Sequence, residues 1–293
     1  DRIKTMSDEM AGDLTAQRRD FHKYAEPGWF EMRTSSIIAR KLTELGYEVL
    51  VGDQVCKKDS RMGVPSEEKL EEQYERAVAQ GADPEFVKYT KGGMTGVIGI
   101  LRCGEGPTVA MRFDIDALGV FEEHDPSHRP AKEGFNSVNE GFMHACGHDG
   151  HATIGLGVAK VLMSIKDQLH GTVKLIFQPA EEHMGAGELV DCNFTQVAKP
   201  DAFIGLHVSP EIDAGSIGLK KGPANASNDF FNIKIKGKGG HGAHPENCID
   251  PVVISGYVIT QLQTVISREN YPVYPGVLTI GSIHGGTVNN IIP

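Results

Sequence analysis

The first hundred residues alternate between helical and extended patterns of hydrophobic side chains. Residues 7–24 and 35–45 carry apolar residues at helical spacing, and Gly46 is expected to end the second of these helices. Residues 47–51 are aromatic and β-branched enough to predict a strand. The highly charged residues 67–80 predict a helix with a solvated face.

The middle of the chain predicts strands separated by one long helix. Residues 97–101 and 108–113 are two β-rich runs joined by a short glycine-containing loop, a pattern typical of a hairpin. A helix at about 151–165 separates them from strands at 172–177 and 201–208. Because strands alternating with helices pair in parallel, we expect a largely parallel α/β sheet covered by helices.

The last quarter of the chain predicts a second, smaller unit. A strand at 232–236, a helix at about 250–267 and a strand at 276–283 have a periodicity of their own. We therefore expect a catalytic domain at 1–222 and an α+β domain at 223–293. The sheet of this second domain is expected to be only half built, because the chain stops after its second strand.

The composition narrows the classes of partner. The 293 residues include 29 Lys and Arg and 39 Asp and Glu, a net charge of −10, with no long basic stretch. This charge disfavours nucleic acid and anionic membranes as partners, and no apolar run approaches the ~18 residues of a membrane span. Five irregularly spaced cysteines are typical of a reducing compartment, so we expect a cytoplasmic protein.

The segment from His144 to His151 holds three histidines and one cysteine. Cys146 and His148 are separated only by a glycine, so both side chains can point at one centre. A thiolate combined with imidazole suits a transition metal and does not suit magnesium or calcium. The alternative is a buried cysteine beside histidines that cap the following helix.

Further candidate ligands follow the predicted strands. Glu181 and Glu182 come after one strand, and one carboxylate of such a pair can bind metal while its neighbour acts as a base. His207 closes a second strand, and Asp114 and Asp116 end a third. Taken singly, these residues can equally be solvated or structural. In α/β sheets ligands bind beyond the carboxyl ends of the strands, so together they favour a two-metal site.

A glycine-rich turn in the second unit carries one more candidate. His241 lies between Gly240 and Gly242, where small neighbours leave its ring accessible. Asn290 lies in a second polar, glycine-containing segment near the end of the chain. From the residues alone, His241 is either a catalytic group or an ordinary turn histidine.

Several segments, in this order, resemble the M20 metallopeptidase and amidohydrolase family: HACGHDGH, PAEE, GLHV, GKGGHGAHP and GGTVNNIIP. The resemblance is to its bacterial aminoacylase and auxin-conjugate hydrolase branch and extends over nearly the whole chain. It implies an aminopeptidase-like α/β catalytic domain with a mostly parallel sheet and an inserted ferredoxin-like α+β lid used for dimerisation. It also implies a further segment that completes the lid and carries one more metal-binding histidine.

The resemblance implies two divalent metal ions, Mn²⁺ or Zn²⁺, held by Cys146, His148, Glu182 and His207. Cys146 would bridge the ions, and Asp116 would orient the ligands from behind. Asp114 stands where other branches have a histidine ligand, and His148 is expected to replace it.

The same resemblance implies the catalytic roles. Glu181 would be the general base, and His241 would reach from a neighbouring subunit to stabilise the oxyanion. Asn290 would help to hold the substrate. The family usually has glycine after the paired glutamates, whereas this chain has His183, which we expect to be a pocket wall rather than an extra ligand.

The implied reaction is hydrolysis of an amide between an acyl or aroyl group and an amino acid. p-Aminobenzoyl-glutamate is the first expected substrate, followed by indole-acetyl-aspartate and simple N-acyl amino acids. The expected partners are this carboxylate-bearing small molecule and a second copy through the lid, or a paralogous subunit. Rival hypotheses are a non-catalytic partner subunit and a redox protein built on Cys146 with Cys192.

Overall fold

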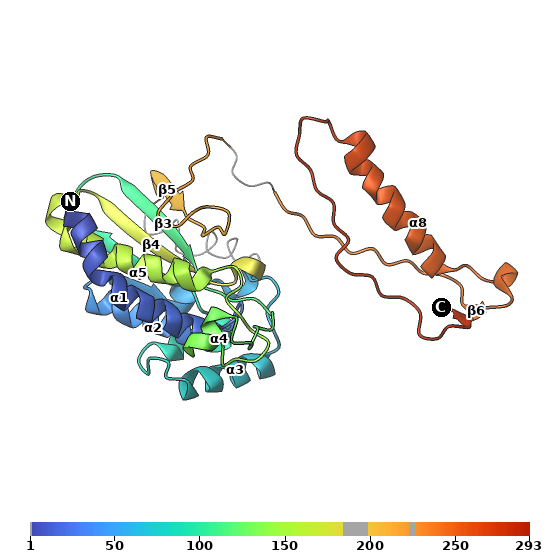
Figure 1. The fold of residues 1–293 in the computed structure, drawn as a ribbon, viewed down its shortest axis with the longest axis horizontal. Coiled ribbons are helices and arrows are strands. Elements are labelled where there is room, and N and C mark those ends of the chain that lie inside the picture. Colours follow the sequence, from blue (N-terminus) through green and yellow to red (C-terminus); the bar gives the residue numbers. More distant parts are fainter. Residues whose placement is uncertain (1, 184–198, 223–226) are drawn as a thin grey trace. The chain divides into compact units, whose positions relative to one another are not determined.

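The computed structural model describes residues 2–183, 199–222 and 227–293. It contains two compact units, residues 1–216 and 217–293 (Figure 1). The predicted division into 1–222 and 223–293 places its boundary near this one, while the roles predicted for the two domains stay predictions. Among the described helices, none is both long enough and apolar enough to cross a membrane.

The first unit is built on a five-stranded mixed sheet with the order β1-β2-β4-β3-β5 (Figure 1). Its strands are β1 (Glu48–Val51), β2 (Val97–Arg102), β3 (Thr108–Asp114), β4 (Thr172–Gln178) and β5 (Ala202–Gly205). β3 runs parallel to both β4 and β5, whereas β2 runs antiparallel to β1 and β4. The predicted largely parallel sheet is therefore correct for three strands and wrong for the other two.

The predicted hairpin of β2 and β3 is wrong, because β4 lies between these two strands. β4 is apolar over most of its length and its last five residues are buried. A central position gives both of its edges hydrogen-bonded partners, which a hairpin of β2 and β3 would not provide. The loop between β2 and β3 passes over the start of β4, where Gly171 (φ 83°) approaches the backbone of Pro107.

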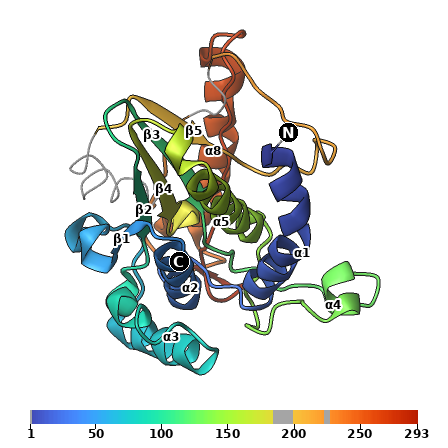
Figure 2. The ribbon, with the colours of Figure 1, turned by 90° about the vertical axis from the view of Figure 1, so that its left-hand side faces the viewer.

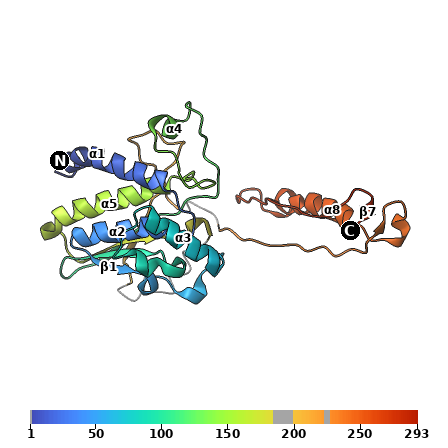
Figure 3. The same cartoon turned by 90° about the horizontal axis from the view of Figure 1, so that it is seen from below.

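Three helices run side by side on one face of this sheet: α1 (Arg2–Lys23), α2 (Met32–Glu44) and α5 (His148–Ser164) (Figures 2 and 3). The core between helices and sheet includes Phe113 and Phe177, whose ring centroids are 5.4 Å apart. α5 approaches these rings at Gly155, where a Cβ atom would lie 2.7 Å from Phe177 and 2.8 Å from Phe113. A glycine is thus required where this helix crosses the sheet.

α3 (Glu67–Ala79) confirms the predicted charged helix, and its first turn is capped by the Ser66 hydroxyl. A short helix, α4 (Arg129–Glu133), lies in the polar loop before α5. Short 3₁₀ turns occupy Gly52–Gln54, Lys58–Ser60, Val87–Gly93, Lys166–Gln168, Glu181–His183 and Pro245–Asn247, and a π-helical turn occupies Val265–Glu269.

The second unit contains the predicted helix as α8 (Pro251–Thr264), capped by the Asp250 carboxylate. Its one described strand pair is short, with β6 (Gly240–His241) antiparallel to β7 (Ile291–Ile292). The strands predicted at 232–236 and 276–283 are wrong, since neither segment is a strand within residues 227–293. Both segments are largely exposed, and a strand needs a neighbour for its backbone hydrogen bonds. The ferredoxin-like lid therefore stays a prediction.

Candidate functional site

The candidate site lies at the carboxyl ends of the three parallel strands. Asp114 ends β3, Glu181 and Glu182 follow β4, and His207 follows β5. Because these strands point the same way, their ends meet at one edge of the sheet. α5 begins at the same edge, so its first residue His148 joins the group.

The four predicted ligands come together at this edge. The sulfur of Cys146 lies 3.3 Å from Nε2 of His207. Ligand atoms of Cys146, His148 and His207 all lie within 4.8 Å of one another, as do those of His148, Glu181 and Glu182. The two groups share His148, so they form one continuous cluster of sulfur, nitrogen and oxygen ligands.

A hydrogen bond to Asp116 orients His148. Nδ1 of His148 lies 3.0 Å from Oδ1 of Asp116, and both side chains are fully buried. A carboxylate accepts at this distance, which places the proton on Nδ1 and leaves the lone pair of Nε2 available. Nε2 is buried and has no hydrogen-bond partner within the described residues, as expected of an atom meant for a metal.

Asp116 also binds the backbone of the paired glutamates. Its other oxygen, Oδ2, accepts a 3.0 Å hydrogen bond from the backbone N–H of Glu182. One buried carboxylate therefore fixes both a candidate histidine ligand and a candidate carboxylate ligand. This is the orienting position that the sequence predicted for Asp116.

The electrostatics of the cluster favour a cation. Burial, together with the carboxylates of Glu182, Glu181 and Asp116, raises the pKa of the Cys146 thiol to about 12. Such a thiol is a poor nucleophile or redox centre at neutral pH, which disfavours the redox hypothesis. A divalent ion would stabilise the thiolate and offset the surrounding negative charge, so these residues fit a transition-metal site. Cys192, the proposed redox partner, lies outside the described residues.

The protonation of His148 and Glu181 reflects the same excess of negative charge. Burial alone lowers the pKa of His148, but the Asp116 hydrogen bond and the charges of Asp114 and Glu181 outweigh it and raise the pKa. Burial, followed by the charge of Asp114, raises the pKa of Glu181. A carboxylate whose pKa is raised toward neutrality is better suited to accept and return a proton.

His151 is a site residue that the sequence analysis did not assign. Its Nε2 accepts a 3.0 Å hydrogen bond from the backbone N–H of Val208, and its Nδ1 lies 3.3 Å from Oδ2 of Asp114. Both nitrogens are thus engaged, and His151 holds the backbone next to His207 in place. The available signal was its position three residues after His148, on the same side of one helix.

The remaining acidic candidate, Asp114, pairs with Arg112. The Arg112 guanidinium lies 3.0 Å from Oδ2 of Asp114, which is fully buried. Arg112, considered as a carboxylate-binding group for the substrate, thus already has a carboxylate partner. Asp114 also belongs to a third group of potential ligand atoms, with His148 and His151.

His183 lies against the surface of this turn. Cβ atoms built on Gly28 and Gly63 would lie 2.5 Å and 3.3 Å from its ring, so two glycines make room for the imidazole. Its side chain is exposed, consistent with the expectation of a pocket wall.

A second missed residue is Glu31, just before α2. Its carboxylate is fully buried and accepts a 2.7 Å hydrogen bond from the backbone N–H of Ala180. Burial, followed by the charge of Asp116, raises the pKa of Glu31. No local signal in the sequence distinguishes this glutamate from the others, because its partner lies 149 positions away.

His241 and Asn290 lie in the second unit, next to one another. The backbone N–H of Gly242 donates to the backbone oxygen of Asn290 at 2.9 Å, and His241 pairs with Ile291 between β6 and β7. The ring of His241 is exposed, and its Nδ1 accepts from the backbone N–H of Ala243. Their catalytic roles stay predictions.

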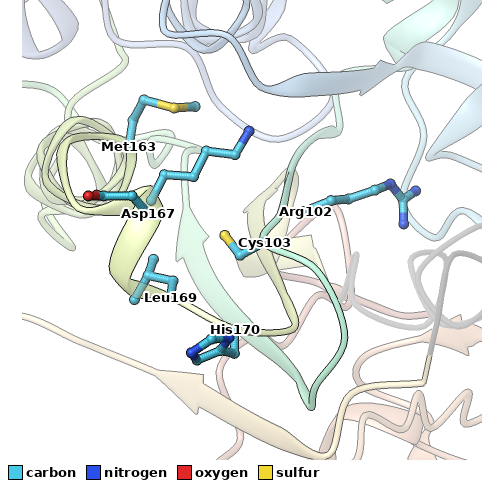
Figure 4. Close-up of a pocket in the computed structure, with 7 residues that line it drawn as sticks. Arg102, Cys103, Met163, Asp167, Leu169 and His170 are labelled. Atoms are coloured by element: carbon cyan, nitrogen blue, oxygen red, sulfur yellow. The ribbon is translucent and has the colours of Figure 1, made fainter.

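A surface pocket of about 610 Å³ lies at the opposite end of the parallel strands (Figure 4). It includes His170, which precedes β4, whereas the paired glutamates follow β4. Its walls contain none of the predicted site residues and are formed by Arg102, Cys103, Met163, Lys166, Asp167, Leu169 and His170.

Comparisons with known proteins agree with this arrangement. The family model described as peptidase family M20/M25/M40 matches residues 110–287. One of the named subunits of p-aminobenzoyl-glutamate hydrolase from Escherichia coli K12 is 39% identical over 287 residues, which cover 97% of this chain and 64% of that protein. The chain belongs to peptidase family M20/M25/M40.

Two further M20-related proteins help to delimit the match. Indole-3-acetyl-aspartic acid hydrolase of Enterobacter agglomerans is 38% identical over 288 residues, which cover 97% of this chain and 65% of that protein. The solved YXEP protein of Bacillus subtilis, described as a dinuclear metal binding peptidase from the M20 family, is 28% identical with a TM-score of 0.56. That match covers 88% of this chain and 57% of the solved chain. The chain therefore spans less than two thirds of the length of these relatives.

Proposed function

We propose that this protein is a metal-dependent hydrolase of the amide bond between an acyl or aroyl group and an amino acid. The observation that carries the proposal is the convergence of Cys146, His148, Glu182 and His207 beside the free carboxylate of Glu181. A thiolate, two imidazoles and a carboxylate together form a ligand set for transition metals. Membership of the M20 family supports the same chemistry.

The four ligands hold two divalent ions, Mn²⁺ or Zn²⁺. When bound, such ions supply a water of lowered pKa and polarise the scissile carbonyl. The lone pair of His148 Nε2 points to the metal because Asp116 binds the opposite ring nitrogen. The description of the Bacillus subtilis relative as dinuclear supports two ions rather than one.

The carboxylate of Glu181 acts as general base. A carboxylate oxygen of Glu181 takes the proton from the attacking water and later gives it to the leaving amine nitrogen. The raised pKa of this residue supports both steps. His241, supplied by a neighbouring subunit, stabilises the charge that develops on the carbonyl oxygen, and Asn290 helps to hold the substrate.

p-Aminobenzoyl-glutamate is the best candidate substrate, cleaved to p-aminobenzoate and glutamate. The name of the Escherichia coli relative supports it, and that of the Enterobacter agglomerans relative supports indole-acetyl-aspartate as the next candidate. Simple N-acyl amino acids follow. The protein acts in the cytoplasm as a homodimer through its second unit, or with a paralogous partner, since the Escherichia coli relative is named as one subunit of its hydrolase.

A substrate panel with metal control tests the proposal. The purified protein is stripped with a chelator, reloaded with Mn²⁺ or Zn²⁺, and assayed on p-aminobenzoyl-glutamate, indole-acetyl-aspartate and N-acetyl amino acids. We expect hydrolysis that needs the metal and is fastest on p-aminobenzoyl-glutamate. Metal-independent turnover, or metal binding without any hydrolysis, contradicts the proposal. Activity that appears only with a second subunit identifies a non-catalytic partner.

A further inference from the structure

Two buried carboxylates hold the backbone of the turn that carries the paired glutamates. At its start, the N–H of Ala180 donates to Oε1 of Glu31 at 2.7 Å, and two residues later the N–H of Glu182 donates to Oδ2 of Asp116 at 3.0 Å. Both carboxylates are at most 1% exposed. Hydrogen bonds to a charged acceptor are stronger than neutral ones, so the turn is fixed at two points.

The turn has a backbone conformation that needs such support. Ala180 has φ 46°, the left-handed region that side chains other than glycine rarely adopt. Ala180 is fully buried and packs in the same apolar cluster as Trp29, which has φ 68°. Strained residues of this kind persist only where their surroundings over-determine them, and they cluster at functional sites.

Glu31 is itself held rigidly. The hydroxyl of Thr95 donates to its Oε2 at 2.7 Å, so each carboxylate oxygen has one partner. Its backbone oxygen accepts from the N–H of Ser35 in the first turn of α2. The position of Ala180 is therefore coupled to α2 and to the residue before β2, far from the paired glutamates in sequence.

We propose that Glu31 is a positioning residue for the metal site. Its bond to Ala180 holds the left-handed turn that places the Glu182 carboxylate against the metal and the Glu181 carboxylate against the water. This inference rests on the proposed function, because it takes Glu182 as a ligand and Glu181 as the base. Glu31 contacts neither metal nor substrate and acts only through the backbone of Ala180.

Titration of the stripped protein with Mn²⁺, combined with steady-state kinetics, tests this role. Glu31→Ala removes the acceptor, and we expect Mn²⁺ to bind about 10- to 100-fold more weakly, as for other residues that orient metal ligands. kcat should fall more than KM rises, because the base moves together with the ligand. Glu31→Gln keeps an oxygen for Ala180, and we expect its Mn²⁺ affinity to stay within about threefold of the wild type.

Glu26 provides a matched control. It is a fully buried glutamate on the same connection, and its carboxylate accepts from the backbone N–H groups of Arg33 and Thr34 at the start of α2. Glu26→Ala should lower the melting temperature but leave Mn²⁺ affinity unchanged. Equal losses of affinity in Glu26→Ala and Glu31→Ala would mean general destabilisation and overturn the inference.

The remaining outcomes are also decisive. A folded Glu31→Ala variant that binds Mn²⁺ as tightly as the wild type overturns the role of Glu31 and leaves the proposed function intact. A wild-type protein that binds no divalent ion overturns both. Should Glu31→Ala fail to fold, Thr95→Val decides instead, because it releases the other oxygen of Glu31 and should weaken Mn²⁺ binding in the same direction.

Discussion

Nδ1 of His148 lies 3.0 Å from Oδ1 of Asp116, and both side chains are completely buried. The second oxygen of Asp116 accepts from the backbone of Glu182, so one carboxylate orients two candidate ligands that lie on different elements. The geometry of the metal cluster therefore depends on a residue that does not itself belong to it.

Replacement of Asp116 by alanine should weaken divalent-metal binding by about 10- to 100-fold, because His148 loses its fixed tautomer and Glu182 loses its backbone anchor. Titration calorimetry on the stripped protein measures this directly. Asp201→Ala is a suitable control, because Asp201 Oδ2 accepts from the backbone N–H of Thr108 at the opposite end of β3. Unchanged affinity in Asp116→Ala would contradict the orienting role.

Glu181→Gln should keep its metal and lose turnover. Removal of a general base typically costs about 10²- to 10⁴-fold, which should appear in kcat on p-aminobenzoyl-glutamate. Metal content measured by elemental analysis should match the wild type, because Glu182 remains as the ligand. Glu105→Gln, in the loop between β2 and β3, serves as a distant control. A Glu181→Gln variant with full activity would remove this residue from the role of base.

The stability of the first unit should depend on the protonation of His22. Its ring lies 2.9 Å from both Asp149 and Glu122. Burial alone lowers the pKa of His22, but these two hydrogen-bonded carboxylates outweigh it and raise the pKa. A raised folded-state pKa means that the stabilisation is complete below the unfolded value of about 6.5 and is lost as pH rises through the folded value.

The melting temperature should therefore fall between about pH 6.5 and pH 9 in the wild type, and this slope should shrink in His22→Gln. At about pH 6 the variant should be less stable by roughly 3–5 kcal/mol, since it leaves two buried carboxylates without their cation. His128→Gln is the matched control, because His128 contacts the same oxygen of Glu122 from a more exposed position. Identical slopes in wild type and His22→Gln would refute the linkage.

Gly155→Ala should destabilise the first unit by about 1–3 kcal/mol, because the new methyl group overlaps Phe113 and Phe177 beneath α5. Gly12→Ala, in α1, has open space around the added carbon and should be neutral or stabilising by up to about 1 kcal/mol. Chemical denaturation of both variants measures the difference. A stable Gly155→Ala protein would mean that α5 can move away from the sheet at little cost.

The helices were largely predictable from the sequence, because their signals are local. The apolar spacing and Gly46 predicted α2, and the Asp250 carboxylate that caps α8 precedes the predicted helical run. Strand partners were not predictable in the same way. Placement of β4 between β2 and β3 depends on contacts between residues about 70 positions apart along the chain, which hairpin periodicity does not contain.

The candidate site divides in the same manner. Cys146, His148, Glu182 and His207 were identified because metal-binding side chains are rare and follow strand ends. His151 and Glu31 were missed because each acts through one hydrogen bond to a distant backbone N–H, of Val208 and Ala180.

The sequence alone determined which side chains can bind a metal, which segments are helical, and that the chain resembles one hydrolase family. Only the tertiary structure decided the strand order, the tautomer of His148 and the buried carboxylates that fix the turn after β4. Side-chain chemistry and helical periodicity are properties of neighbouring residues, whereas register, burial and hydrogen-bond partners exist only once distant segments have packed together.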